Sequence, residues 1–364
     1  MNMKGTILFR CDGSHEIGFG HIVRCIALAD ELRDKHGSGV VFAVLYDNKA
    51  MEMILNHGYK VETANPREDQ FDYGDWFNCI VKKNHPCALI LDIRDDLPPN
   101  IVSNLRKKGI LVVTIDDPTD RRLLADLAFY PPVPQVEKMD WQGFTGQRFI
   151  GWEWVILRRE FSHNDENLYK RIKATKKTKI HNILVTMGGS DPKGMTLKTM
   201  EALKVIDGQF EVTIILGPGF AHRDSLNEIL GNFPHIHRIF ENVLNIGDIM
   251  AEADLAVASF GVTAYELAAM GVPSVYLSLT EDHLQSASVF QNDGMAFSLG
   301  LESEVIGDMI ASSVQCLLNN KDLCQSMTKK ALKKIDGLGA TRIAQFVASS
   351  IIDRGGYPNE SQMG

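Results

Sequence analysis

One histidine stands where a helix is expected to begin, directly behind a glycine-rich turn. The segment DGSHEIGFGHIVR places His21 after Gly18 and Gly20, following a short apolar run. Glycines let the backbone approach a ligand closely, and the free N–H groups of a helix start favour an anion. The positive end of the helix dipole also favours a neutral imidazole that can accept a proton. We predict a general base at His21, with a capping or packed histidine as the alternative.

A second glycine turn follows the apolar run ILVTM. It reads Gly-Gly-Ser-Asp-Pro from 188 to 192, with helix-capping residue types ahead of a proline. Such a turn presents backbone N–H groups at the carboxyl end of a strand, where open α/β sheets bind ligands. We predict that Gly189 and Ser190 contact a diphosphate or an acceptor, and an ordinary strand-to-helix turn is the alternative.

The third candidate is the segment SFGVTAYELAAMGVP. Gly261, Val262 and Thr263 open a short predicted helix whose free N–H groups can bind phosphate. Glu266 lies one turn further and can accept hydrogen bonds from a ribose diol. An isolated α/β turn with a surface glutamate would look similar, but the combination of turn, Glu and Gly-x-Pro is more specific than either glycine loop.

Polar side chains also follow several predicted strands. They are Asp12, Asp117, Glu281, Asp282, His283 and Gln285. The last four could contact a sugar or belong to a solvated loop. Asp117, behind the run ILVVTI, could orient a substrate hydroxyl or cap the next helix, and Asp12 has a similar status.

The elements that must position these residues alternate in type along the chain. Short apolar runs such as VVFAVLY and CALILDI alternate with amphipathic stretches, which predicts an α/β protein with parallel sheets. Ile22, Ile26, Ala29 and Leu32 form one helical stripe that should end near Gly37.

The alternation breaks once, which predicts two Rossmann-like domains. We expect an N-terminal domain over 1–165, a charged linker over 166–178, a C-terminal domain over 179–352 and a polar tail over 353–364. A chain of 364 residues is long enough for two domains with a core each.

Composition excludes several classes of function. A formal net charge of -8 argues against a nucleic-acid-binding protein, which would be expected to carry a basic surface. No apolar run is long enough to span a membrane. The six cysteines form no CxxC pair, so we expect free thiols and no metal site. The missing third glycine of GxGxxG argues against a dinucleotide cofactor. We expect a cytoplasmic enzyme without cofactors, and leave its oligomeric state open.

Several motifs in order resemble a known family. The segments RCDGSHEIGFGHIVRCIALADEL, ILVTMGGSDP and AYELAAMGVPSV, among others, resemble the UDP-2,4-diacetamido-2,4,6-trideoxy-β-L-altropyranose hydrolases of pseudaminic acid biosynthesis. These hydrolases are related to a GT-B glycosyltransferase of peptidoglycan synthesis. The likeness runs from about residue 6 to residue 300.

The resemblance implies a GT-B-like fold with two domains facing a cleft. UDP would be held mainly by the second domain, with Glu266 at the uridine ribose and the sugar facing the first domain. His21 matches the residue that activates water for inverting attack on the anomeric carbon. No metal is implied.

Some positions depart from the family pattern. Glu281, Asp282 and His283 stand where the hydrolases usually read Glu-Asn-Gln, and Trp154 stands for a tyrosine. The departures leave the sugar open, and they also fit a sister enzyme that transfers the sugar to a hydroxyl acceptor. A non-catalytic protein that binds sugar nucleotides is a third reading, against which the presence of His21 argues.

Overall fold

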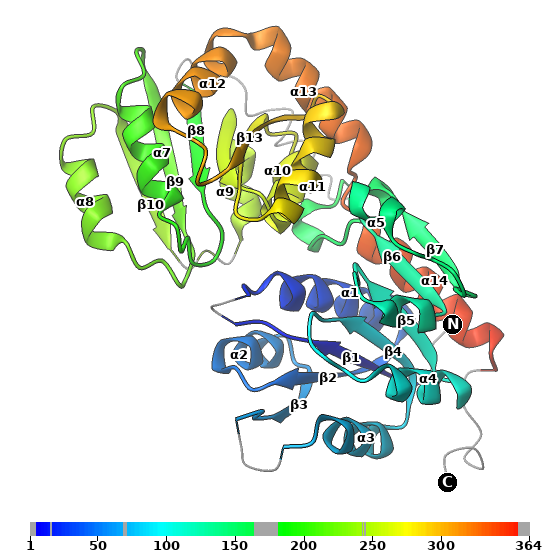
Figure 1. Cartoon of the computed structure of the whole chain (residues 1–364). Coiled ribbons are helices and arrows are strands. Elements are labelled where there is room, and N and C mark those ends of the chain that lie inside the picture. The colour runs from blue at the N-terminus through cyan, green and yellow to red at the C-terminus, as the bar shows by residue number, and fades with distance from the viewer. Residues whose placement is uncertain are drawn as a thin grey trace. The chain divides into compact units, whose positions relative to one another are not determined.

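The chain forms two compact units. The structure is a computed structural model, and it describes residues 5–14, 17–67, 71–163, 181–241, 243 and 245–355. The N-terminal unit comprises Met1–Pro132, Val136–Arg158 and Leu338–Gly364, and the C-terminal unit comprises Val133–Gln135 and Arg159–Gly337. The division confirms two α/β domains, each with its own sheet (Figure 1).

A parallel sheet organises the N-terminal unit. Its strands are β1 (Thr6–Cys11), β2 (Gly39–Leu45), β3 (Lys60–Ala64), β4 (Pro86–Asp92), β5 (Leu111–Ile115), β6 (Leu127–Tyr130) and β7 (Gln147–Ile150). Their order is β3-β2-β1-β4-β5-β6-β7, with every pair parallel. All seven residues of β4 are buried, as expected for a central strand covered on both faces.

Helices cover both faces of this sheet. They are α1 (Gly20–His36), α2 (Asn48–Asn56), α3 (Tyr73–Asn84), α4 (Pro99–Lys107) and α14 (Gly339–Asp353), and the unit also contains the short turns η1 (Asp120–Leu124) and η2 (Trp152–Trp154). The residues of the short helix α5 (Pro134–Lys138) are divided between the two units. Successive strand residues alternate between two cores, because side chains along a strand point to opposite faces. Ile7 and Phe9 pack with α1 and α14, whereas Leu8 packs with α3 and α4.

The local sequence explains α1. The predicted stripe of Ile22, Ile26, Ala29 and Leu32 is buried, at 4% exposure or less. The helix ends at Gly37, whose φ of 69° lies in the left-handed region that favours glycine.

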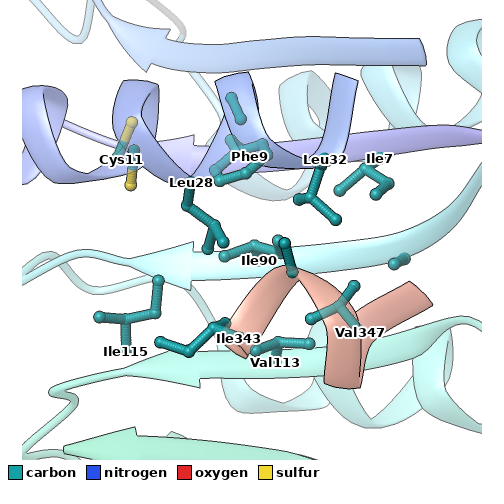
Figure 2. Packing of buried hydrophobic residues seen from close by; sticks show 14 of the residues in the cluster. Ile7, Phe9, Cys11, Leu28, Leu32, Ile90, Val113, Ile115, Ile343 and Val347 are labelled. Carbon is teal, nitrogen blue, oxygen red and sulfur yellow. The ribbon is translucent and has the colours of Figure 1, made fainter. Parts of the chain in front are cut away.

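The last helix corrects the predicted domain boundaries. We expected the C-terminal domain to run from 179 to 352. Instead this unit ends shortly after α13 (Lys321–Lys334), and the chain returns to the N-terminal unit at Leu338, ahead of α14. Ile343 and Val347 of α14 are fully buried beside Ile90 and Val113 (Figure 2). The apolar stripe of α14 completes the first core, so the helix cannot belong to the second.

The other boundary also differs from the prediction. The main segment of the C-terminal unit begins at Arg159, in the turn η3 (Arg159–Phe161), ahead of the predicted boundary at residue 165. The predicted linker over 166–178 lies outside the described residues, as does most of the predicted tail.

A second parallel sheet organises the C-terminal unit. Its strands are β8 (His181–Thr186), β9 (Phe210–Leu216), β10 (Ile236–Glu241), β11 (Leu255–Ser259), β12 (Ser274–Ser278) and β13 (Ala296–Leu301), in the order β10-β9-β8-β11-β12-β13. Its helices are α7 (Met195–Lys204), α8 (Arg223–Gly231), α9 (Ile246–Glu252), α10 (Val262–Ala269), α11 (Glu281–Asn292), α12 (Gly307–Asn319) and α13. Ile183, Val257 and Val275 lie in a core shared with α7 and α12.

Candidate functional site

In the N-terminal unit, the candidate residues gather where the strand order reverses. β1 and β4 are neighbours in the sheet although two strands separate them in sequence, and ligands bind outside the carboxyl ends of strands at such a point. The glycine turn follows β1 there. Ser14 and Gly18 exchange backbone hydrogen bonds across the turn, and Gly18 has a φ of 79°. The turn therefore delivers Gly20 and His21 to the start of α1.

His21 is hydrogen-bonded to a buried carboxylate that the sequence did not single out. Nδ1 of His21 lies 2.6 Å from Oδ1 of Asp92, the last residue of β4. The Asp92 side chain is fully buried, and the His21 side chain is 19% exposed. The pair thus joins a solvent-accessible ring to an anchored carboxylate, 71 residues apart in sequence.

Arg24 lies one helical turn after His21 and binds the same carboxylate. Its Nε donates to Oδ2 of Asp92 and its Nη2 donates to Oδ1, so the guanidinium binds both carboxylate oxygens. Burial by itself works to raise the pKa of the Asp92 carboxyl, but Arg24 and His21 outweigh it and hold that pKa well below its usual range. Asp92 is therefore ionised at neutral pH.

The charge of Asp92 determines which nitrogen of His21 can act as a base. An ionised carboxylate only accepts hydrogen bonds, so Nδ1 of His21 must carry the hydrogen that it donates to Asp92. In the neutral ring, Nε2 is then the acceptor. The arrangement of carboxylate, imidazole and open nitrogen is the one that orients a general base.

Asp12 is fixed by a buried arginine. Its Oδ2 accepts from Nη2 of Arg10 at 2.7 Å, and its Oδ1 accepts from the backbone N–H of Leu45 at 2.8 Å. Arg10 is fully buried and also donates to Asp95 and Tyr73. Asp12 therefore lies at the carboxyl end of β1 with both oxygens engaged in structural contacts.

Asp117 is held by hydrogen bonds in the turn that follows β5. Its Oδ1 accepts from both the N–H and the hydroxyl of Thr119, and its Oδ2 pairs with Arg121 at 3.2 Å. The residue is only 1% exposed. Its neighbour Asp116 is more open, with a φ of 52°, and accepts hydrogen bonds from Arg24 and Arg94. The N-cap of η1 is Thr119 and not Asp117, so Asp117 supports the capping residue instead of capping the helix itself.

In the C-terminal unit, two glycine loops meet where its strand order reverses. The Gly-Gly-Ser turn follows β8, and the predicted phosphate-binding turn follows the neighbouring strand β11. Ser190 is half-buried and Gly189 is exposed. Asp191 has a φ of 44° and accepts from the backbone N–H groups of Met195 and Thr196, which caps α7. The Gly-Gly-Ser turn is therefore held in place by its own aspartate.

A third loop supports this turn and was missed from sequence. Gly219 donates its backbone N–H to the carbonyl of Gly189 at 2.8 Å. A side chain on Gly217 would overlap the carbonyl oxygens of Gly188 and Gly189. The sequence LGPG after β9 was the available signal, because a close backbone approach of this kind requires glycine.

The turn after β11 opens helix α10. Gly261 is its N-cap residue, and Val262 and Thr263 are half-buried in its first turn. Glu266 is 5% exposed, which excludes the reading as a plain surface residue. The turn that opens α10 follows the strand next to β8, and a Cβ atom on Gly188 would lie 3.4 Å from the Ser259 hydroxyl, so the two turns are neighbours.

The polar residues after β12 lie in the first turns of α11. Thr280 caps this helix by accepting from the N–H of His283. Glu281 and Asp282 are exposed, whereas His283 and Gln285 are half-buried. Burial lowers the pKa of His283, and its Nδ1 is buried without a hydrogen-bond partner among the described residues. The four residues therefore belong to a helix start and not to a solvated loop.

The candidates thus fall into two groups, one for each unit. Gly18, Gly20, His21, Asp12 and Asp117 follow strands of the first sheet, and Gly189, Ser190, Gly261, Val262, Thr263, Glu266, Glu281, Asp282, His283 and Gln285 follow strands of the second. The sequence analysis did not single out Asp92. This residue ends the buried strand β4, a position similar to that of Asp117, which follows the buried strand β5. Arg24 was not singled out either.

Three known proteins align with much of the chain. MJ1062 of Methanocaldococcus jannaschii, which is uncharacterized, is 30% identical over 280 residues, covering 74% of this chain and 55% of that protein, so the chain spans little more than half of its length. The spore coat polysaccharide biosynthesis protein SpsG of Bacillus subtilis is 24% identical over 348 residues, which are 92% of this chain and 96% of SpsG.

The family that the motifs resemble is also among these relatives. The UDP-2,4-diacetamido-2,4,6-trideoxy-β-L-altropyranose hydrolase of Campylobacter jejuni is 23% identical over 263 residues, covering 70% of this chain and 84% of the hydrolase. The expected likeness is therefore present, but it is distant and shared with other proteins. No protein-family model matches the chain.

Solved structures confirm the fold class. MurG of Acinetobacter baumannii superimposes with a TM-score of 0.73 at 14% identity, over 95% of this chain and 99% of MurG. The UDP-GlcNAc 2-epimerase of Neisseria meningitidis gives a TM-score of 0.64 at 12% identity, over 94% of this chain and 100% of the epimerase. The chain has a GT-B-type fold.

Two further observations concern the described residues alone. They contain no group of three His, Cys, Asp or Glu side chains arranged to hold a metal ion. None of the helices they form is both long and apolar enough to cross a bilayer.

Proposed function

We propose that the chain hydrolyses a UDP-linked deoxyamino sugar, releasing UDP and the free sugar. The observation that carries the proposal is the hydrogen bond from His21 to Asp92, which orients Nε2 of the ring as a proton acceptor. The motif likeness to the altropyranose hydrolases and the distant similarity to the Campylobacter enzyme support the choice of substrate class. The similarity to SpsG, which is named for spore coat polysaccharide biosynthesis, supports a substrate from sugar metabolism.

The proposed reaction is a single displacement. Nε2 of His21 accepts a proton from water while the water oxygen bonds to the anomeric carbon. The bond from that carbon to the diphosphate oxygen breaks, and UDP leaves with the electron pair. Asp92 stays ionised and stabilises the imidazolium that forms.

The C-terminal unit supplies the nucleotide contacts in this proposal. The N–H groups of Val262 and Thr263 at the start of α10 and the backbone of Gly189 and Ser190 bind the diphosphate, and they stabilise its charge as it leaves. Glu266 accepts hydrogen bonds from the ribose hydroxyls. Glu281, Asp282, His283 and Gln285 offer polar contacts to the sugar.

A glycosyltransferase is the second candidate. The structural similarity to MurG over almost the whole chain favours it, and one of the distant relatives is an N-acetylglucosamine transferase from Ruminiclostridium cellulolyticum. The same base would then take its proton from a hydroxyl acceptor instead of water.

One assay separates the two candidates. Purified protein is incubated with UDP-2,4-diacetamido-2,4,6-trideoxy-β-L-altropyranose and with UDP-GlcNAc, with and without hydroxyl acceptors, and UDP and free sugar are measured. UDP and free sugar in equal amounts without acceptor support hydrolysis, whereas strict dependence on acceptor selects transfer. Absence of both reactions with measurable UDP binding would overturn the proposal.

The base is tested by replacing His21. We expect His21→Gln to reduce kcat by roughly 100-fold or more while the Kd for UDP changes little, because the base acts on the nucleophile and not on the nucleotide. Isothermal titration with UDP and steady-state kinetics check the two parts. His57→Gln, at the exposed C-cap residue of α2, is the matched control and should leave both values unchanged. A fully active His21→Gln would remove the residue from the mechanism.

A further inference from the structure

Arg24 lies against both members of the His21–Asp92 pair. In addition to its two hydrogen bonds to Asp92, its Nη2 lies 3.0 Å from Nδ1 of His21. Both nitrogens carry hydrogens when Asp92 is ionised, so this is a close contact of two donors to one carboxylate. The Arg24 side chain is 14% exposed.

A buried carboxylate beside a histidine has two opposite effects on a base. It fixes the ring in the useful orientation, but its negative charge also favours the protonated imidazolium. A ring that is already protonated has no free Nε2 and cannot accept a proton from a nucleophile. The anchoring carboxylate therefore needs a compensating positive charge.

The other charged and titratable groups around the ring do not supply that compensation. Asp116 adds a second negative charge, which pairs with Arg24 at 3.4 Å and with Arg94 at 3.0 Å. The thiol of Cys25 donates to Asp92, and burial raises the pKa of this thiol, so it stays neutral. The start of α1 contributes a partial positive charge only. Among the described residues, the side chain that brings a full positive charge into direct contact with Asp92 is therefore Arg24.

We propose that Arg24 is a positioning residue that neutralises the charge of Asp92 in the site. The anchoring carboxylate can then orient the His21 ring without placing an uncompensated negative charge beside it. The inference rests on the proposed role of His21 as a base, but its electrostatic part can be measured without any substrate.

The test replaces the charge of Arg24 and follows the ring directly. Two-dimensional NMR of histidine-labelled protein gives the titration midpoint of the His21 ring, assigned by the signal that disappears in His21→Gln. We expect Arg24→Gln to raise this midpoint by about one pH unit or more. The acid limb of the kcat/KM profile should move upward by the same amount. At pH 8 and above, where the ring is deprotonated in both proteins, most of the lost activity should return.

Three further variants make the result specific. Arg24→Lys keeps the charge and should retain a midpoint close to that of the original protein. Arg24→Gln combined with Asp92→Asn removes both charges, so it should cancel most of the upward shift. Arg33→Gln removes a positive charge from the exposed end of the same helix and should shift nothing.

Failure of the inference and failure of the proposed function give different results. An unchanged midpoint in Arg24→Gln, in a protein that still binds UDP, overturns the inference. A raised midpoint in a protein that releases no UDP from any substrate leaves the inference standing and overturns the proposed hydrolysis. If Arg24→Gln does not fold, the double variant is compared with Asp92→Asn alone. The inference then requires a higher titration midpoint of the His21 ring in the double variant, and an equal midpoint overturns it.

Discussion

At the scale of single residues, the site depends on buried charges that compensate one another. Asp92 is fully buried but touches two side chains that carry or can carry a positive charge. Burying one unpaired charge is costly, so such a cluster is stable only when every member is present. The same cluster links the ionisation of Asp92 to the stability of the N-terminal unit.

This link gives a prediction for the pH dependence of stability. The pKa of Asp92 is lower in the folded protein than in the unfolded chain. Its contribution is therefore fully present above an ordinary Asp pKa of about 4, and is lost as the pH falls further toward the folded value. The free energy of unfolding of Asp92→Asn should differ from that of the original protein most at pH 7, and the difference should shrink below about pH 4.

Urea unfolding at pH 7, 5, 4 and 3 measures this difference. Asp34→Asn, on the exposed end of α1, is the control and should show a small difference at every pH. A difference between the original protein and Asp92→Asn that stays constant down to pH 3 would contradict the assigned ionisation.

At the scale of elements, the loops after parallel strands support one another. In the second sheet, the loops after β8 and β9 approach so closely that one of them requires glycine. The conformation of each loop therefore depends on the position of its neighbour. The backbone positions of the loops are determined by the neighbouring strands, so residue types that are flexible in isolation are held in a defined arrangement.

A glycine substitution tests this mutual support. Gly217→Ala places a methyl group against the carbonyl oxygens of Gly188 and Gly189, so the Gly-Gly-Ser turn must shift. We expect UDP affinity to fall by roughly 10-fold, or about 1.4 kcal/mol. Isothermal titration with UDP measures the change. Gly231→Ala, where a methyl group meets no atom, should bind UDP normally. Normal UDP binding by Gly217→Ala would show that the Gly-Gly-Ser turn does not contact the nucleotide.

At the scale of the whole molecule, the chain crosses between its units more than once. The N-terminal unit is completed by α14, which lies after the entire C-terminal unit in sequence. Helices α1 and α14 share one core with β1, β4 and β5 (Figure 2). The N-terminal unit therefore cannot reach its full stability until the last helix of the chain is available.

A substitution in α14 should consequently weaken the first unit. Ile343 is fully buried in that core, and Ile343→Ala should lower the free energy of unfolding of the N-terminal unit by about 2 to 5 kcal/mol. Hydrogen exchange measured by mass spectrometry should show faster exchange in β1, β4 and α1, while peptides of β8 and β11 stay unchanged. Gln345→Ala, on the exposed side of α14, is the control. Faster exchange confined to the C-terminal unit would refute the assignment.

The sequence by itself determined the local features of this protein. The period of its apolar residues predicted the alternating strands and helices, and its glycine turns predicted where helices begin and ligands can approach. These features depend on neighbours within a few residues, such as the stripe of α1 and the left-handed cap at Gly37.

Only the tertiary structure decided which distant residues meet. Strand pairing places Asp92 beside His21, and the buried stripe of α14 packs in the first core although the helix follows the second. An apolar stripe shows that a helix face is buried, but several cores can accept the same stripe. Likewise, a carboxylate at a strand end gains its role from the neighbouring strand, and strand order is a property of the folded sheet.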